Sequence, residues 1–238
     1  MNRRKISVLA ALLLCVALGA LMVFMALSPA PHAQPAPAIE ASRHQVAAQP
    51  EVTLSDSAGT IDLAAALAPR SLGDPNAPLK LEEFASLNCG HCAHFARDVF
   101  PKLKKGYIDT GKLYYTFTDF PLNAPALAGS VVARCVPRES YFSFLDFLFG
   151  SVEKWSFEGN YADILIQSGK LAGGDEETLR ACLMSDPLKI GIVEKMQQAG
   201  EAHGIDSTPS FLLNDKTVIK GALPYKELQK ILDGALKE

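Results

Sequence analysis

The first apolar stretch of the chain runs without a charged residue from Ile6 to Leu27 and comes directly after Arg3, Arg4 and Lys5. A helix of this length, at about 1.5 Å per residue, spans a hydrocarbon core of about 30 Å. A signal peptide has the same order of charged and apolar parts, but its apolar core is shorter. Residues 1–27 are therefore predicted to be a membrane anchor or a cleaved signal peptide, and in both cases the rest of the chain is exported.

The next stretch, residues 28–70, begins rich in Ala and Pro and shows no apolar periodicity. This composition is typical of an extended linker, because such a segment cannot bury a core. Near its end, Ile61–Leu67 fits one short helix. We expect the folded domain to begin after residue 70.

Two strand patterns with a helix between them come after the linker. Leu79–Ala85 is a short apolar-rich run entered through a turn-forming segment, and Lys112–Phe120 alternates apolar and polar residues. Between them, Phe95, Val99 and Leu103 recur at helical spacing. Strand, helix and strand in this order predict a parallel pair joined by a crossover helix.

The remainder of the chain changes from helices to strands. No convincing strand pattern occurs in residues 124–203, whereas Phe211–Leu213 and Thr217–Ile219 are predicted strands and Tyr225–Leu236 a closing helix. The order is β-α-β, an all-helical insertion, then β-β-α, and the fold class is α/β. The predicted parts of the folded domain are residues 71–123, the helical insertion 124–203, and residues 204–238.

Composition and charge narrow the function classes. The chain has 48% hydrophobic and 21% charged residues, as an ordinary globular protein has. Its 23 basic and 26 acidic residues give a net charge of −3, so we expect no nucleic-acid partner. Five cysteines are too few for a disulfide-dense scaffold, and each position has to be interpreted separately.

Two of these cysteines form the motif Cys89-Gly90-His91-Cys92, at the end of the first strand and the start of the crossover helix. The free N–H groups and the positive end of the helix dipole favour a thiolate there. Cys89 at the cap is the predicted nucleophile, and Cys92, one turn later, the buried resolving thiol. His91 is expected to stabilise the thiolate through its imidazole.

Other interpretations of this motif have less support from the sequence than a redox-active pair. A c-type haem site needs His directly after the second Cys, where this chain has Ala93. A zinc site needs two further ligands, of which His94 is one candidate, with no second pair at metal spacing. A purely structural disulfide would close so short a loop that it would stabilise the fold only slightly. We expect no metal and no cofactor other than the redox-active Cys89–Cys92 disulfide.

Two further positions belong with this chemistry. Glu83, six residues before Cys89, lies on the strand beneath the helix, where burial would raise its pKa and let it exchange a proton with Cys92. An ordinary glutamate at a strand edge is the alternative. Thr208-Pro209 precedes the third strand, where a cis bond or an ordinary trans turn would fit.

Together these features resemble the DsbA family of exported thiol–disulfide oxidoreductases, which have a thioredoxin fold with a helical insertion. The resemblance covers roughly residues 71–238. It implies that Cys89 is the nucleophile, Cys92 the resolving thiol, and Thr208 and cis-Pro209 a loop that faces them and helps bind substrate. Its motifs lie in residues 84–95, 107–112, 120–122 and 204–211. The chain departs from the family's typical Pro-His by having Gly-His, and has Thr208 where the best-known members have Val.

The predicted function is the introduction of disulfide bonds into folding proteins in the periplasm. A membrane quinone-linked partner would reoxidise the enzyme, and residues 6–27, when uncleaved, would tether it to the inner membrane. A disulfide reductase or isomerase on the same scaffold is the first alternative. A non-catalytic exported binding module or holdase is the second.

The other cysteines are Cys15, inside the apolar segment, and Cys135 and Cys182 in the helical insertion. Four exported cysteines allow three pairings. With Cys89 and Cys92 assigned to catalysis, an oxidising compartment favours a structural Cys135–Cys182 disulfide. Two separate buried thiols are the alternative.

Overall fold

The computed structural model describes residues 61–237. The predicted anchor or signal segment, Cys15 and most of the predicted linker lie outside these residues. No helix within residues 61–237 is both long enough and apolar enough to cross a membrane.

A five-stranded sheet with the order β1-β3-β2-β4-β5 forms the centre of the fold. β2 and β3 are parallel, with Leu79 opposite Leu113, and the other neighbours are antiparallel. This is the predicted β-α-β and β-β-α arrangement of the thioredoxin fold, with one additional strand. The strands are β1 (Arg70–Leu72), β2 (Leu79–Ala85), β3 (Leu113–Asp119), β4 (Ser210–Leu213) and β5 (Thr217–Lys220).

The additional strand lies at the predicted boundary between the linker and the folded domain. β1 begins at Arg70 and lies at the edge of the sheet, with Leu72 opposite Tyr115 of β3. Gly73 ends it with φ +94, and a Cβ there would lie 2.5 Å from the Leu113 carbonyl oxygen. Three residues are too few to show an alternating pattern, so the sequence did not predict this strand.

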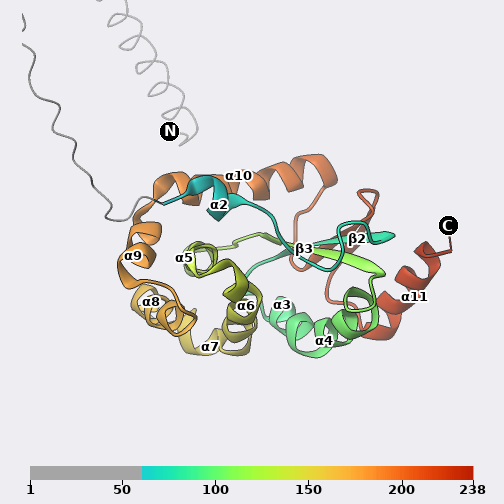
Figure 1. The fold of residues 1–238 in the computed structure, drawn as a ribbon, viewed down its shortest axis with the longest axis horizontal. Coiled ribbons are helices and arrows are strands. Elements are labelled where there is room, and N and C mark those ends of the chain that lie inside the picture. The colour runs from blue at the N-terminus through green and yellow to red at the C-terminus, as the bar shows by residue number, and fades with distance from the viewer. Residues whose placement is uncertain (1–60, 238) are drawn as a thin grey trace, which may run out of the picture. The chain divides into compact units, whose positions relative to one another are not determined.

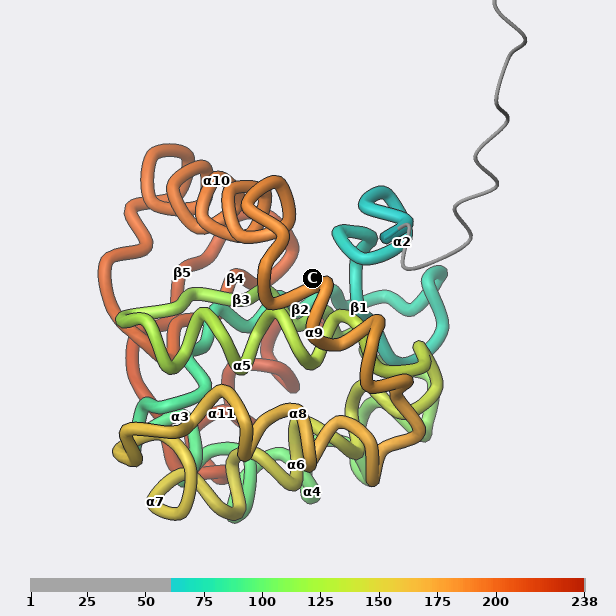
Figure 2. The backbone as a smooth tube through the Cα atoms, turned by 90° about the vertical axis from the view of Figure 1, so that its left-hand side faces the viewer, coloured from blue at the N-terminus to red at the C-terminus, as the bar shows by residue number. Residues whose placement is uncertain are grey.

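Helices cover both faces of the sheet. α10 (Asp186–His203) lies on one face, and α3 (Gly90–His94), α4 (Phe100–Leu103) and α11 (Tyr225–Ala235) lie on the other (Figures 1 and 2). α3 and α4 belong to one continuous helical run that includes two π-helical segments, Phe95–Val99 and Lys104–Ile108. The crossover helix therefore extends to Ile108.

The helical insertion packs beside the sheet (Figure 1). A large apolar cluster joins β2 and β3 to the insertion and contains Phe117, Tyr141 and Trp155. The indole N–H of Trp155 donates to the Leu148 carbonyl at 3.0 Å, so this buried polar group is satisfied. The insertion helices are α5 (Ala124–Cys135), α6 (Tyr141–Gly150), α7 (Val152–Trp155), α8 (Tyr161–Leu171), α9 (Glu176–Met184) and α10.

A disulfide between Cys135 of α5 and Cys182 of α9 is present, with their Cα atoms 6.6 Å apart. This is the pairing expected from the cysteine count. It closes a sequence separation of 47 residues within the insertion. Chain entropy gives such a loop about 4 kcal/mol of stabilisation.

Basic side chains hold the segment that precedes the first strand. Four consecutive carbonyls after the start of α2 (Leu63–Leu67), those of residues 66–69, accept hydrogen bonds from Arg134, Lys195 and Arg138. Arg134 also donates to Asp119 at 2.6 Å, and both side chains are buried. The insertion thus fixes the entry of the chain into the sheet.

Candidate active site

Cys89 and Cys92 lie where the sequence predicted them, at the start of the crossover helix. Cys89 is the N-cap residue of α3 with an extended backbone (φ −83), four residues after β2 ends. Both are free thiols; Cys89 is partly exposed and Cys92 is fully buried. An incoming molecule can therefore reach the Cys89 sulfur but not the Cys92 sulfur.

The Cys89 thiol is acidic because its surroundings stabilise the thiolate. A hydrogen bond from the Cys92 thiol contributes most, partial burial opposes it, and Thr208 and the backbone N–H groups of Cys92 and His91 contribute further. Together they lower the pKa of Cys89 to about 5. At neutral pH Cys89 is therefore a thiolate, the form that acts as nucleophile and as a good leaving group.

Cys92 has the opposite character. Burial raises the pKa of this thiol far above its ordinary value, and the neighbouring Cys89 and Glu83 raise it further. Cys92 consequently keeps its proton and donates to the Cys89 sulfur. At neutral pH Cys89 is thus a thiolate, whereas Cys92 is a protonated thiol.

Glu83 is buried on β2 and accepts a 2.5 Å hydrogen bond from the Tyr115 hydroxyl. Burial raises its pKa to about 8, while the Tyr115 hydrogen bond opposes that rise. A carboxyl group with such a pKa can hold or release a proton near neutral pH. Glu82 points to the other face of the sheet, where it accepts a hydrogen bond from Thr118.

The structure brings the backbone of His91 to the Cys89 sulfur, and the role predicted for its imidazole stays a prediction. His91 is exposed, and its backbone N–H stabilises the Cys89 thiolate. The chain turns into α3 at this point, so the N–H faces the sulfur whatever the side chain is. His94 is also exposed and pairs with Asp98 at 2.7 Å.

The Thr208–Pro209 bond is cis. The Cys89 thiol donates to the Thr208 carbonyl at 3.4 Å, across 119 residues of sequence. The Thr208 hydroxyl is buried and has no hydrogen-bond partner while Cys89 is protonated. When Cys89 is a thiolate, this hydroxyl can donate to its sulfur. The fold thus places this loop directly against the nucleophile.

Tyr115 is the site residue that sequence reasoning missed. It lies on β3 opposite Leu81 of the parallel β2, two residues along from Glu83, and both side chains point to the same face. The signal was the alternation of both strands. Using it required the register of the pair, which the sequence does not state.

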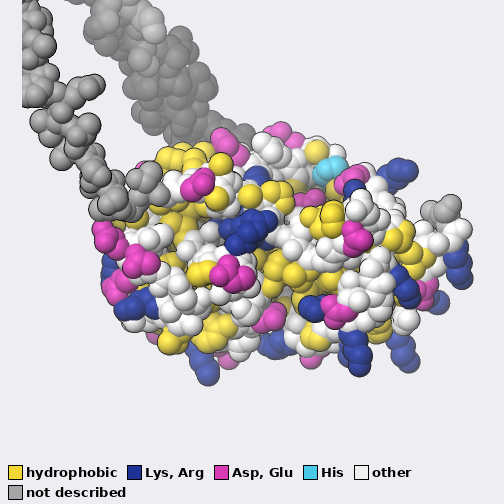
Figure 3. Space-filling view, viewed as in Figure 1, with side chains coloured by type: hydrophobic (Ala, Val, Ile, Leu, Met, Phe, Trp, Pro, Cys, Tyr) yellow, Lys and Arg dark blue, Asp and Glu magenta, His cyan; other side chains and the backbone are white. Residues whose placement is uncertain are grey.

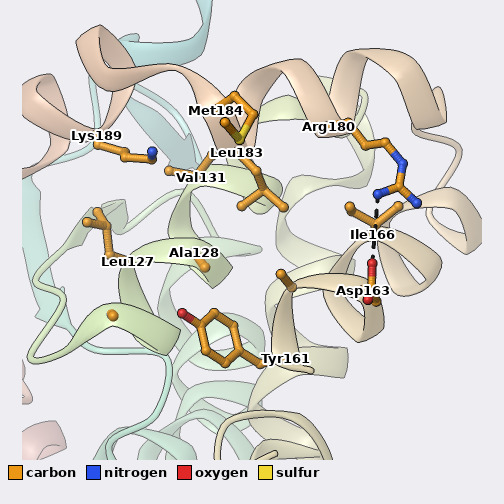
Figure 4. A pocket seen from close by; sticks show the side chains of 12 residues that line it. Leu127, Ala128, Val131, Tyr161, Asp163, Ile166, Arg180, Leu183, Met184 and Lys189 are labelled. Atoms are coloured by element: carbon orange, nitrogen blue, oxygen red, sulfur yellow. Dashed lines mark ion pairs between the residues drawn. The ribbon is translucent and has the colours of Figure 1, made fainter. Parts of the chain in front are cut away.

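Away from the thiol pair, the described residues form a cavity in the helical insertion, and the face shown in Figure 3 has no strongly charged region. Acidic and basic side chains are interspersed on the part of residues 61–237 that Figure 3 shows. A cavity of about 530 Å³ lies in the helical insertion, and Arg180 pairs with Asp163 at its edge, 3.7 Å apart (Figure 4). It contains neither thiol, and its apolar lining includes Leu127, Val131, Ile166 and Leu183.

The fold and the thiol pair define the class: a thioredoxin fold with a helical insertion and a Cys-x-x-Cys pair at the start of the crossover helix. Residues 66–234 match the family described as thioredoxin. The crystal structure of a DsbA from Wolbachia pipientis is 31% identical, with a TM-score of 0.65, over 70% of this chain and 90% of that one. The chain belongs to the thioredoxin family, in its DsbA-like branch of thiol–disulfide oxidoreductases.

Curated relatives carry related names. One from Rickettsia felis, named "Putative protein-disulfide oxidoreductase", is 30% identical over 168 residues, which are 70% of this chain and 60% of that protein. "Disulfide bond formation protein D" of Bacillus subtilis is 29% identical over 70% of this chain and 76% of its own. The chain spans about 53–60% of the length of the rickettsial relatives.

Proposed function

We propose that this protein is an exported oxidoreductase that introduces disulfide bonds into folding proteins. The observation that carries the proposal is the low pKa of the Cys89 thiol, which lies beside the buried Cys92 thiol. A stable thiolate favours the reduced form of the pair, so the oxidised pair readily accepts electrons. The DsbA-like family membership supports the same reaction.

The proposed reaction starts from the Cys89–Cys92 disulfide. A substrate thiolate attacks the accessible Cys89 sulfur, the Cys89–Cys92 bond breaks, and Cys92 leaves with the electron pair and takes a proton. A second substrate thiolate attacks the substrate sulfur of the mixed disulfide, and Cys89 leaves as a thiolate. The substrate loses two electrons and forms a disulfide, while the enzyme retains one proton on Cys92.

Glu83 is proposed to supply and remove the Cys92 proton. Cys92 is fully buried, so solvent does not reach its sulfur directly. The electrostatic effect of the Glu83 carboxyl on the Cys92 thiol supports this role, and its pKa of about 8 suits proton exchange near neutral pH. We expect Glu83→Gln to slow both formation and opening of the Cys89–Cys92 disulfide.

Export is proposed on two grounds. The basic residues and the apolar run of residues 6–27 have the order of an anchor or a signal, and the Cys135–Cys182 disulfide suits an oxidising compartment. We propose a periplasmic location, with a tether to the inner membrane when residues 6–27 remain. A membrane quinone-linked protein would reoxidise the reduced pair and complete the cycle.

The redox potential of Cys89–Cys92 in a glutathione buffer tests the direction of electron flow. A value near −120 mV, about that of DsbA, is expected, together with rapid oxidation of a reduced unfolded protein. A value near −270 mV, about that of thioredoxin, would indicate a reductase instead. A value near −180 mV with scrambled-disulfide repair would indicate an isomerase, and no glutathione-linked transition a binding module. Cys89→Ser is the control that abolishes the transition.

A further inference from the structure

A cavity of about 450 Å³ lies beside the thiol pair and has no role in the thiol chemistry itself. One wall is formed by the turn and helix that carry the thiols, including Asn88, Gly90 and Arg97. The opposite wall is formed by residues 149–154 and Phe157, at the end of α6, in α7 and just after it. The cavity therefore lies between the thioredoxin part and the helical insertion.

This cavity adjoins the stretch of backbone that carries the nucleophile. Asn88 and Gly90 both line it, and they are the neighbours of Cys89 in the chain. Consecutive Cα atoms are about 3.8 Å apart, and an extended chain advances about 3.3 Å per residue. A polypeptide joined to the Cys89 sulfur thus reaches the cavity within about three residues of its own cysteine.

The lining suits a large apolar side chain. Ala93, Phe149 and Val152 are buried and give the cavity an apolar wall, whereas Phe157 is 73% exposed at its edge. An exposed aromatic side chain beside an apolar hollow is typical of a surface that binds another chain.

Charged side chains surround this apolar part. Arg97, Glu153 and Lys154 line the cavity, are exposed, and form no ion pair with any residue in the described part of the chain. An apolar centre with a solvated polar rim is the arrangement found in protein-binding sites.

We propose that this cavity binds a large apolar side chain, such as Phe or Leu, one to three residues from the substrate cysteine. The inference rests on the proposed function, since only a chain that reacts at Cys89 is held there. Such side chains are accessible mainly before a protein has folded. The cavity would therefore favour cysteines in unfolded segments over cysteines on finished surfaces.

The test uses the oxidised protein and two reduced single-cysteine peptides that differ only in Phe or Ser two residues from the cysteine. The rate of mixed-disulfide formation is measured for each, with dithiothreitol as a thiol that cannot fill the cavity. Partial burial of the Phe side chain is expected to make its peptide react about five- to tenfold faster than the Ser peptide.

Two variants alter the cavity in opposite ways. Phe157→Ser removes its exposed aromatic edge, and Gly150→Leu adds a side chain where a Cβ meets no atom within 4 Å. Both are expected to bring the Phe/Ser rate ratio close to one and to leave the reaction with dithiothreitol unchanged. Phe147→Ser is the matched control, because Phe147 is 48% exposed on α6 and does not line the cavity.

The outcomes separate the subsite from the proposed function. Failure of the wild-type protein to react with dithiothreitol would overturn the function and the subsite with it. A normal reaction with dithiothreitol but equal rates for the two peptides would overturn the subsite alone. So would a rate ratio that Phe157→Ser and Gly150→Leu leave unchanged, or one that Phe147→Ser abolishes to the same extent.

Discussion

Removal of the Cys92 thiol should raise the pKa of Cys89, because the hydrogen bond from Cys92 is the largest contribution to that low value. A hydrogen bond to a charged group is worth about 1.5–3 kcal/mol, and one pKa unit corresponds to about 1.36 kcal/mol. Cys89 is partly exposed, so solvent screening reduces the effect to about one unit. We expect the pKa to rise from about 5 to about 6 in Cys92→Ala.

Cys92→Ser is the matched control, because its hydroxyl still donates a hydrogen bond and should keep the pKa near 5. The assay is the ultraviolet absorbance of the Cys89 thiolate against pH, with the rate of alkylation as a second readout. At pH 5.5 the thiolate fraction should fall from about three quarters in the wild type to about one quarter in Cys92→Ala. The same midpoint in all three proteins would refute the assignment of the low pKa to Cys92.

The same pKa has a consequence for stability. Since the pKa of Cys89 is lower in the folded protein than its ordinary value of 9.0, the thiolate stabilises the reduced fold above about pH 5. At pH 7, two units above the folded value, the gain is at most about 2.7 kcal/mol, and solvent screening reduces it to roughly 1–1.5 kcal/mol. Denaturant unfolding should show the advantage over Cys89→Ser shrinking as the pH falls towards 5.

Three further changes have definite expected outcomes. Glu83→Gln removes a buried carboxyl whose pKa is raised from 4.5 to about 8, so the stability of this variant relative to the wild type should rise between these pH values, by up to about 5 kcal/mol in denaturant unfolding. Replacing both Cys135 and Cys182 by Ala should cost about 4 kcal/mol in the same assay while the Cys89 absorbance titration stays unchanged; a shifted titration would show that the disulfide also acts on the site. Arg134→Met leaves the buried Asp119 carboxylate without its cation and should cost about 3–5 kcal/mol; a loss below about 1 kcal/mol by thermal unfolding would contradict this.

Local patterns were sufficient for much of the fold. β2 occupies Leu79–Ala85 as the sequence predicted, because its apolar composition and flanking turn are local signals. The helix start at Cys89 was equally accessible, since a strand end followed by a helical pattern locates it. β1 was missed because a three-residue edge strand is defined by its partner, Phe117 and its neighbours on β3, rather than by its own pattern.

The remaining site features depend on register and on side-chain direction. Tyr115 meets Glu83 only because β2 and β3 pair in one particular register. The His91 imidazole points to solvent, and nothing in the motif specifies the direction of that side chain. The contact between Cys89 and Thr208 spans 119 residues and was expected only from the family resemblance.

The four carbonyls of residues 66–69 also bear on how the chain folds and how far it can be shortened. Their donors lie 66 to 128 residues further along the sequence, on α5, on the short turn after it that carries Arg138, and on α10. These carbonyls therefore emerge first during synthesis and have no side-chain donors until those segments have formed. We infer that residues 61–69 dock late, after the parallel pair has assembled. The insertion is for the same reason not a removable module, because its deletion would leave these four carbonyls without the side chains that donate to them.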